Sequence, residues 1–318
     1  MRVPLKTIIS SSAQSSGHFL AKSGIFVKSG QHNTYVYGFG FNEVKENAKR
    51  ASQFEALERL WATYAFHQDK KNFIGYSLKT PNECRIFSPS QVLIGSVLTS
   101  EEKSADANGL GCHPAIDQAV NHAVLELIER HLLAEIWYED GLVFEIKEKA
   151  LIREDGWQVR FYTSLGIDVP LAIAIVSNTD KSVWVLGSAL RESLSQSSEH
   201  AKNEAFMLLE SAFFENGTAY SKDIEKRLLS LKNKNYSHAR EDFFRAKVSN
   251  KNKQIDVTSK IYSTREIVEK VLGDNSIWIV NLFNDVRISV VRAICDFAKN
   301  PRWFRHLQSG FPPLDPFC

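Results

Sequence analysis

Two stretches of this chain resemble each other: residues 38–59, GFGFNEVKENAKRASQFEALER, and residues 109–130, GLGCHPAIDQAVNHAVLELIER. Both begin with Gly-x-Gly and carry a glutamate 17 residues after the first glycine, followed by a Glu-Arg pair. A third stretch, residues 187–208, keeps the glycine and the glutamate at the same step but ends in Met207 and Leu208. The chain therefore contains a weak internal triplication.

Small residues recur inside the three copies. A glycine or alanine stands two residues after each first glycine, and alanine or serine stands ten and fourteen residues after it. Each copy is predicted to fold as a strand, a glycine loop and a helix, with the helices near residues 44–66, 115–138 and 196–214. The expected strands of the chain lie near residues 35–37, 91–97, 157–162, 169–176, 183–189, 277–282 and 288–294. This mixture indicates an α+β fold.

The helical geometry gives the repeated acids a common direction. At 100° per residue, Glu55 and Glu58 lie about 60° apart on one face of the first helix. On the second helix the polar arc of about 120° contains Gln118, His122, Glu126, Glu129 and Arg130. One interpretation is a solvated face, because a Glu-x-x-x-Arg surface pair contributes only about 0.2–0.5 kcal/mol.

A second interpretation follows from the small residues that interrupt these polar arcs. Ala48, Ala51 and Ala62 accompany Glu55, and Ala119 accompanies Glu126, so a ligand could approach the backbone closely. If the three helices converge, several carboxylates meet and repel one another. Mg²⁺ would relieve that repulsion, and it commonly bridges a few carboxylates and the phosphates of a nucleotide.

Composition excludes several classes of protein. Lys and Arg number 39 and Asp and Glu 37, and a formal charge of +2 does not favour a dedicated nucleic-acid-binding protein. No apolar run reaches bilayer length, and the N-terminus lacks the apolar core of a secretory signal. The four cysteines are scattered, which disfavours a disulfide framework or a zinc site and points to a reducing cytoplasm. The chain also contains neither a P-loop nor a G-x-G-x-x-G fingerprint.

Three segments stand apart in composition. Residues 1–30 are Ser-rich and are predicted to be a weakly ordered start, so the main domain is expected at residues 31–318. Residues 221–256 contain ten Lys or Arg and five acids, which is typical of a solvated helical insertion or of a contact surface for an acidic partner. Residues 310–318, GFPPLDPFC, form a Pro-rich tail that cannot be a regular helix.

These motifs resemble the YcaO family. The family pattern of Ser-x-x-Glu-x-x-Glu-Arg matches residues 52–59, and its Asn-Gly loop followed by a helix ending in Glu-x-x-Glu-Arg matches residues 108–130. Residues 289–292, Ser-Val-Val-Arg, are similar to a late strand of the family. The resemblance spans about residues 35–318 and implies a YcaO-type ATP-binding α+β fold without a P-loop.

The resemblance also implies roles for individual residues. Four acids would hold Mg²⁺: Glu55, Glu58, Glu126 and Glu129. The ATP would be bound by Ser52, Arg59, Gln118, His122, Arg130 and Glu204. Arg130 would also act in catalysis, together with the terminal carboxylate of Cys318 at the end of the Pro-rich tail.

Several positions depart from the family pattern. Phe39 stands where a Lys is common, Gln118 where many members have Glu, and His122 where many have Gln. Pro114 replaces an Asn of the glycine turn, and Met207 replaces a Gln of the third motif. These departures leave open a second hypothesis, in which the chain is a catalytically degenerate scaffold or accessory subunit on the same fold.

The first hypothesis is an ATP- and Mg²⁺-dependent cyclodehydratase of ribosomally made peptides such as bacteriocins. It would convert Cys, Ser or Thr to thiazoline or oxazoline rings by phosphorylating the backbone amide oxygen. Its expected partners are the precursor peptide, a separate leader-binding protein related to ubiquitin-activating enzymes, and a flavin dehydrogenase, with a homodimer as a further option. No nucleic acid or membrane partner is expected. Thioamide formation, amidine formation and an accessory role in methylthiolation are alternative chemistries within the family.

Overall fold

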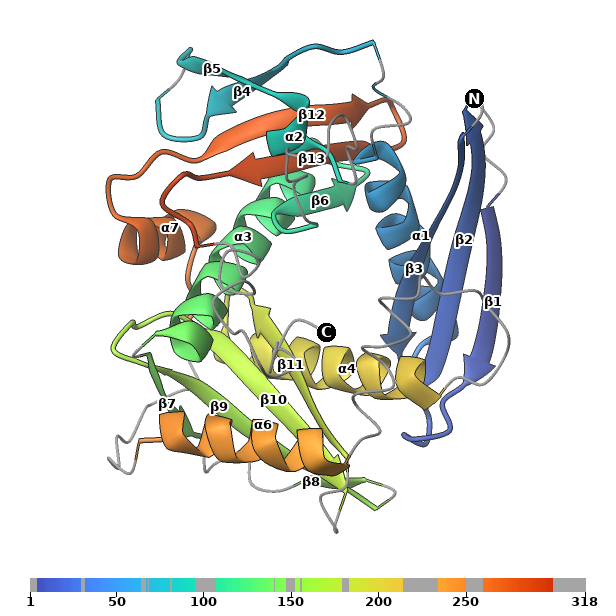
Figure 1. Ribbon diagram of the computed structural model, residues 1–318, viewed down its shortest axis with the longest axis vertical. Coiled ribbons are helices and arrows are strands. Elements are labelled where there is room, and N and C mark those ends of the chain that lie inside the picture. The colour runs from blue at the N-terminus through green and yellow to red at the C-terminus, as the bar shows by residue number, and fades with distance from the viewer. Residues whose placement is uncertain are drawn as a thin grey trace. The chain divides into compact units, whose positions relative to one another are not determined.

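The structure is a computed structural model and describes residues 5–29, 32–63, 67, 69–80, 82–94, 107–139, 141–146, 152–154, 156–178, 183–213, 234–249 and 260–299. The described elements divide between two compact units (Figure 1). The first comprises residues 1–10, 19–130 and 272–298, and the second comprises residues 11–18, 131–271 and 299–318. A single domain over residues 31–318 was predicted, and the division into two units falls inside one continuous helix, α3 (Ile116–Tyr138).

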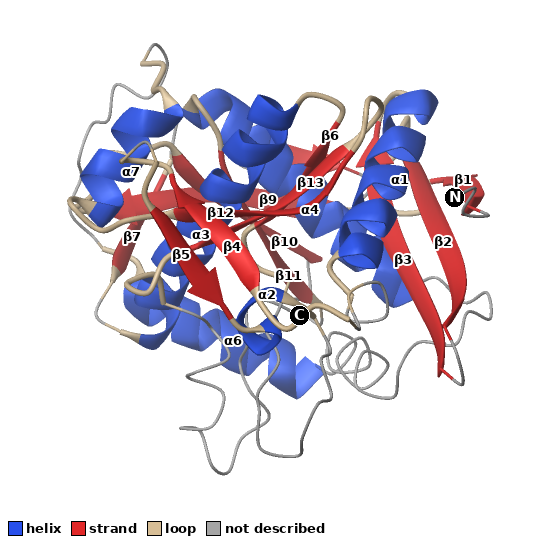
Figure 2. Ribbon diagram, turned by 90° about the horizontal axis from the view of Figure 1, so that it is seen from above, coloured by secondary structure: helices blue, strands red, loops and turns tan. Residues whose placement is uncertain are grey.

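A three-stranded antiparallel sheet opens the first unit, in the order β1 (Leu5–Ser11), β2 (Phe19–Ser29) and β3 (His32–Asn42). Helix α1 (Lys45–Trp61) packs along β2 and β3 (Figures 1 and 2). Its Ala56 and Leu60 form a small core with Ile25 and Val36. The prediction that residues 1–30 are weakly ordered is wrong for residues 5–29, because backbone pairing with β3 orders this Ser-rich stretch.

A second sheet of five strands completes the first unit, in the order β5-β4-β12-β13-β6. Its strands are β4 (Phe73–Ser77), β5 (Cys84–Phe87), β6 (Leu110–His113), β12 (Trp278–Asn284) and β13 (Ser289–Ile294). The short helix α2 (Pro89–Val92) lies where a strand was predicted at residues 91–97. Pro89 at the start of this helix and the capping residue Ser88 favour the helical turn there.

The second unit is built on a sheet in the order β11-β10-β9-β7, with β8 also paired to β9. The strands are β7 (Leu142–Glu145), β8 (Ile152–Glu154), β9 (Trp157–Leu165), β10 (Leu171–Asn178) and β11 (Trp184–Leu190). The predicted hairpin is confirmed, since β10 and β11 pair in antiparallel fashion from Leu171 opposite Leu190 to Ser177 opposite Trp184. Helix α4 (Leu194–Phe213) packs on β10 and β11.

The opposite face of β11 is covered by aromatic side chains. The Phe244 ring of helix α6 (Lys234–Lys247) lies 6.0 Å from the ring of Trp184, and Trp137 at the end of α3 lies 6.3 Å from it. The described part of the basic insertion is therefore a helix, as predicted, but one face of it is buried in the core. The rest of the insertion and the Pro-rich tail lie outside the described residues.

Helix α7 (Thr264–Leu272) leads the chain toward β12 and the first unit. A surface latch precedes it, in which Asp168 accepts hydrogen bonds from the hydroxyl of Tyr262 at 2.7 Å and from Lys260 at 2.9 Å. Within the described part of the chain, no helix combines the length and the apolar character required to cross a membrane.

Candidate functional site

The same hydrogen bond occurs in all three copies of the repeat. The backbone N–H of Phe39 donates to Glu55 at 2.5 Å, that of Leu110 to Glu126 at 3.1 Å, and that of Ser188 to Glu204 at 3.0 Å. In each case donor and acceptor are 16 residues apart, and the acceptor atom is Oε2. The triplication seen in the sequence is therefore a repeated three-dimensional unit.

Each of these N–H groups belongs to a strand at the end of its sheet. β3, β6 and β11 are terminal in the strand orders of their sheets. An edge strand presents backbone donors that no neighbouring strand accepts, and leaving them unpaired is costly. The repeated glutamate accepts one such donor, so it orients its carboxylate and fixes the helix against its own strand.

The glycines of the repeat allow the helix to approach this strand closely. A Cβ at Gly40 would lie 2.0 Å from the carbonyl oxygen of Ala48, one at Gly111 would lie 2.1 Å from that of Ala119, and one at Gly187 would lie 2.2 Å from that of Ala201. The small residues at steps ten and fourteen thus face the strand. This corrects the interpretation that they leave room for a ligand, since the backbone of the strand fills that space.

The acids of α1 and α3 form one cluster in the first unit. Burial raises the pKa of Glu58 well above its ordinary value, and the negative charges of Glu126 and Glu55 raise it further. Two cations, Arg59 and Arg292, oppose this effect. Carboxylates from the first and second copies are therefore close enough to repel one another, as the sequence predicted.

Arg59 connects this cluster to the edge of β3. Its guanidinium pairs with Glu55 at 2.5 Å and donates to the carbonyl oxygen of Tyr37 at 3.3 Å. Burial lowers the pKa of Arg59, but the surrounding carboxylates outweigh burial and raise it overall. The side chain stays charged and is held beside the acids, where it could meet a phosphate.

The acids of the cluster match Mg²⁺ as one or two carboxylate ligands and not as a complete set of metal ligands. Among the described residues, no three His, Cys, Asp or Glu side chains gather in an arrangement that could hold a metal ion. Mg²⁺ is usually bound by one or two carboxylates, with the remaining positions taken by phosphates and water. Burial is the main cause that raises the pKa of Glu58, and the charges of Glu126 and Glu55 add to it; Mg²⁺ would relieve this added repulsion.

The other residues of α3 that were predicted to bind ATP or metal differ from one another in solvent exposure. Gln118 and His122 are exposed and stand at four-residue steps in line with Glu126. Glu129, which was predicted to bind metal, is only 4% exposed. The Nε atom of Arg130 is buried as well. The metal-binding role of Glu129 stays a prediction.

Ser52 is fully buried between α1 and the sheet, where its Oγ donates to the carbonyl oxygen of Lys49 at 2.8 Å and lies 2.7 Å from the Oγ of Ser23. The ATP contact of Ser52 stays a prediction. Glu204 belongs to the second unit, and Cys318 lies outside the described residues.

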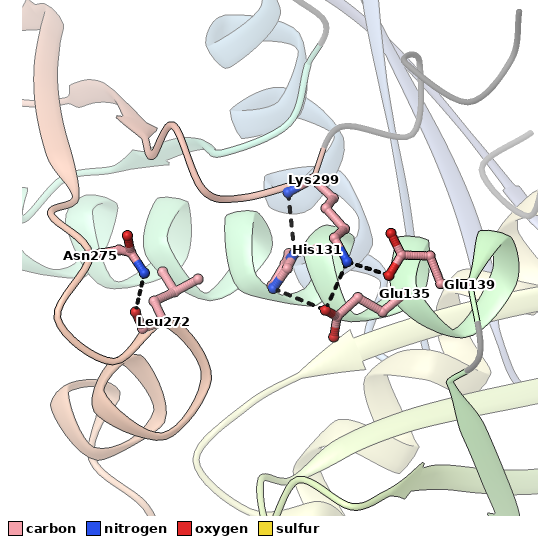
Figure 3. A network of polar contacts seen from close by, with 6 residues as sticks. All are labelled: His131, Glu135, Glu139, Leu272, Asn275 and Lys299. Atoms are coloured by element: carbon pink, nitrogen blue, oxygen red, sulfur yellow. Dashed lines mark hydrogen bonds and ion pairs between the residues drawn. The ribbon is translucent and has the colours of Figure 1, made fainter.

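Beyond Arg130, the last turns of α3 carry a separate polar network (Figure 3). The side chains of His131, Glu135 and Glu139 lie along one face and hold Lys299. The Lys299 backbone N–H donates to His131 Nδ1 at 3.2 Å, and its ammonium contacts Glu135 at 3.1 Å and Glu139 at 2.5 Å. Fixing the chain after β13 is a structural role.

Two residues near the cluster were not identified from the sequence. Cys112 of β6 is 7% exposed, and burial together with the charge of Glu58 raises the pKa of its thiol. Lys22 of β2 is 6% exposed and has its ammonium 4.8 Å from the centre of the Tyr37 ring. No sequence signal marked either, since β2 itself was not predicted.

Comparison with known proteins identifies the family. The family model described as YcaO cyclodehydratase, ATP- and Mg²⁺-binding, matches residues 82–298, which is more than half of the chain. No curated protein matches this chain.

Solved structures share the fold. YcaO from Methanopyrus kandleri, bound with AMPPCP and Mg²⁺, has a TM-score of 0.64 at 15% identity, with 99% of this chain and 91% of that chain covered. The E. coli microcin synthetase McbBCD complex with pro-MccB17 bound gives 0.65 at 10% identity, covering 91% and 87%. A heterocyclase in complex with substrate and cofactor gives 0.65 at 11% identity, covering 93% of this chain and half of the heterocyclase. The chain therefore belongs to the YcaO family, whose ligands are ATP and Mg²⁺.

Proposed function

We propose that this chain is an ATP- and Mg²⁺-dependent enzyme that cyclodehydrates Cys, Ser or Thr residues of a ribosomally made peptide. The observation that carries the proposal is the acid cluster of the first unit, in which the half-buried Glu58 lies close enough to Glu126 and Glu55 for their charges to raise its pKa. Arg59 and Arg292 offset part of the repulsion among these acids, and a divalent cation carrying nucleotide phosphates would offset more of it.

The chemistry consists of one condensation and one phosphoryl transfer. The side-chain thiol or hydroxyl of the peptide adds to the preceding carbonyl carbon, and its proton is lost. The carbonyl oxygen then carries the negative charge, and ATP with Mg²⁺ supplies the phosphoryl group that converts this oxygen into a leaving group. Loss of phosphate, together with the proton of the amide nitrogen, forms the carbon–nitrogen double bond of the ring, so the products are azoline, ADP and phosphate.

The residues of the chain act by position and charge. Glu58 and Glu126 are the proposed metal ligands, because the two carboxylates lie close enough for the charge of Glu126 to raise the pKa of Glu58, whereas Glu55 is paired to Arg59. Arg59 neutralises charge beside them. Gln118 and His122, exposed in line with Glu126, are proposed to contact the nucleotide, and Glu204 and Arg130 keep the roles that the family resemblance implies.

The proposal is tested first by nucleotide binding. Calorimetric titration with Mg·ATP should show binding by the wild-type chain, and Glu58→Gln should weaken it about tenfold or more, since one charged ligand is removed. Glu46→Gln is the matched control, because Glu46 lies on the same helix in an exposed pair with Lys49. Equal affinity of the Glu58 and Glu46 variants would contradict the assignment.

Activity is then measured with a candidate precursor peptide and a leader-binding partner protein. Each ring should release one ADP and lower the peptide mass by one water. Gain of sulfur in place of loss of water would identify thioamide formation. The alternative function, a degenerate scaffold subunit, predicts that millimolar Mg·ATP does not raise the melting temperature, because a ligand that binds the native state must stabilise it.

The proposed partners follow from the same chemistry. A peptide substrate must be presented to the site, and a separate leader-binding protein would hold it there. Co-purification of the chain with such a protein, with and without the precursor peptide, tests this point. A flavin dehydrogenase would act afterwards, because oxidation of an azoline to an azole needs an electron acceptor.

A further inference from the structure

The hairpin of β4 and β5 presents an apolar face that the proposed chemistry does not use. Ile74 and Tyr76 of β4 are 52% and 57% exposed, and Ile86 of β5 is 67% exposed. Ile74 lies directly opposite Ile86, and Tyr76 lies directly opposite the exposed Cys84, so all four side chains share one face of the hairpin. These four residues are called the hairpin face, and the exposed Leu78 follows it in the chain.

Helix α3 covers the other end of the same sheet face. A Cβ at Gly111 of β6 would meet the backbone of α3, and Gly111 lies opposite Val291 of β13. Two residues further along β13, a row of directly paired residues crosses the sheet toward its outer edge (Figure 1). Along this row exposure rises, because Ala293 is 2% exposed, its partner Ile279 is half-buried and Tyr76 is 57% exposed. Within the described residues, the sheet face is therefore covered at β6 and open at β4 and β5.

The two ends of this hairpin carry opposite charge. The end where β4 begins has one acid and two cations, Asp69, Lys70 and Lys71. The turn end has two acids and one cation: Glu83 precedes β5, and Lys79 pairs with Asp274 at 2.5 Å. One end therefore has a net charge of +1 and the other a net charge of −1, with the apolar residues between them.

This charge pattern is complementary to itself. When two such hairpins face each other with their strands antiparallel, the positive end of one lies over the negative end of the other. The apolar centre of each hairpin then meets an apolar sheet face of the same composition, as in the packing of two sheets. A strongly acidic or basic partner would instead be repelled at one of the two ends. Pairing of two β5 edges side by side would leave Ile74, Tyr76 and Ile86 exposed, so it would not bury the hairpin face.

We propose that the hairpin face binds the hairpin face of a second copy of this chain, in a two-fold symmetric dimer with antiparallel hairpins. In this arrangement Ile74, Tyr76 and Ile86 of both copies are buried, and the two ends form symmetric contacts between unlike charges. A single hairpin is smaller than the roughly 800 Å² per partner of a standard interface, so the dimer is weak and depends on protein concentration. The inference does not depend on the proposed function.

The first test is sedimentation velocity of the purified full chain over about 1–200 µM, where a weak dimer dissociates measurably. The wild type should show a monomer–dimer equilibrium. Ile86→Glu places a charge in the hairpin face and should raise the dissociation constant of the dimer about tenfold or more. Val286→Glu is the matched control, because Val286 is 98% exposed between β12 and β13, and it should dimerise as the wild type does.

The second test exchanges charges between the ends of the hairpin. Lys71→Glu and Glu83→Lys should each weaken the dimer about threefold or more at low salt, because each creates like-charge contacts at two symmetric places. The double variant should return close to the wild-type dissociation constant, because its ends again meet with unlike charges. Such a rescue requires that the two ends come from two copies of the same surface.

Several outcomes would overturn the inference. A wild type that stays monomeric over the whole range, equal dimerisation of Ile86→Glu and Val286→Glu, or a double variant without rescue would each do so. Iodoacetamide labelling of Cys84, mapped by peptide mass, then identifies the other occupant. Slow labelling of a monomer that becomes fast in Ile86→Glu would show that another segment of this chain covers the face. If Ile86→Glu does not fold, Tyr76→Lys is measured in its place with the same criteria.

Discussion

Replacing Gly40 by alanine should destabilise the first unit because it separates β3 from α1. The new Cβ would lie 2.0 Å from the carbonyl oxygen of Ala48, whereas real Cβ atoms keep at least 3.0 Å from such atoms. Helix and strand must therefore move apart by about 1 Å at this point, and overpacking of this kind costs about 1–3 kcal/mol. For a domain of 150–250 residues each kcal/mol lowers the melting temperature by about 2–4 °C, so a fall of about 2–12 °C is expected.

The matched control is Gly24→Ala on the neighbouring strand β2. A Cβ there would also approach an atom to 2.0 Å, but that atom is the hydroxyl of Tyr35, at the end of a half-exposed side chain that can turn away. Scanning calorimetry of the purified full chain measures both variants against wild type. The reasoning is refuted if Gly40→Ala melts within about 1 °C of wild type, or if Gly24→Ala loses as much stability as Gly40→Ala.

The remaining predictions concern protonation. Because the pKa of Glu58 is raised, the metal-free protein should lose stability as pH rises above the ordinary value of 4.5. Mg²⁺ binding should release a proton from Glu58, so Mg·ATP affinity should increase with pH. Glu58→Gln should flatten the pH profile of stability and that of Mg·ATP affinity. Burial lowers the pKa of His67, which contacts the carbonyl oxygen of Trp61 at 2.8 Å. Stability should therefore fall as pH drops below about 6.5, because the unfolded chain binds the proton more readily. In urea titrations, the stability of His67→Gln should depend less on pH in this range. The hydrogen bond from Tyr262 is the main cause that holds the pKa of Asp168 below its ordinary 3.8, so the ionised Asp168 stabilises the fold above that pH and loses this effect in acid. Because Asp168 is exposed, Asp168→Asn should lower the free energy of unfolding by under about 1 kcal/mol at neutral pH. A larger loss in urea unfolding would contradict this surface role.

The fixed step from glycine to glutamate allowed much of the fold to be predicted. Helix α1 was predicted at residues 44–66 and runs over Lys45–Trp61, and α3 and α4 agree with prediction to within two residues at each end. A helix of this length shows its period clearly in the sequence. The carboxylate cluster was also foreseen, because Glu55 and Glu58 share a helix face and Glu126 stands at the equivalent step.

Other features depend on partners that are distant in the sequence. β1 and β2 were missed although they contain strand-forming residues such as Ile8, Ile25 and Phe26, because the Ser-rich residues 10–16 between them led the whole stretch to be interpreted as weakly ordered. In the structure β2 pairs with β3, and β1 pairs with β2. The unit boundary inside α3 carries no Gly, Pro or polar linker that could mark it. Ala48 and Ala119 were assigned to the approach of a ligand because the sequence does not show that the strand of the same copy lies against them.

The repeated hydrogen bond also explains why the three copies differ in charge. In every copy one oxygen of the glutamate at step 17 accepts a hydrogen bond from an edge-strand N–H. This acid therefore has a structural role that is common to the three copies. The acid at step 20 does not recur in every copy. It is present as Glu58 in the first copy and as the buried Glu129 in the second, and it is replaced by Met207 in the third.

The acids whose charges interact therefore belong to the first two copies, where Glu126 raises the pKa of Glu58. The structural role of the glutamate and the role of its charge can be tested separately at Glu126. Glu126→Gln removes the charge but keeps an oxygen for the N–H of Leu110, so it should weaken Mg·ATP binding while leaving the melting temperature near wild type. Glu126→Ala removes both, so it should also lower the melting temperature by leaving the edge donor unpaired. Equal melting temperatures for the two variants would show that the strand cap contributes nothing and that the recurrence of this glutamate has another cause.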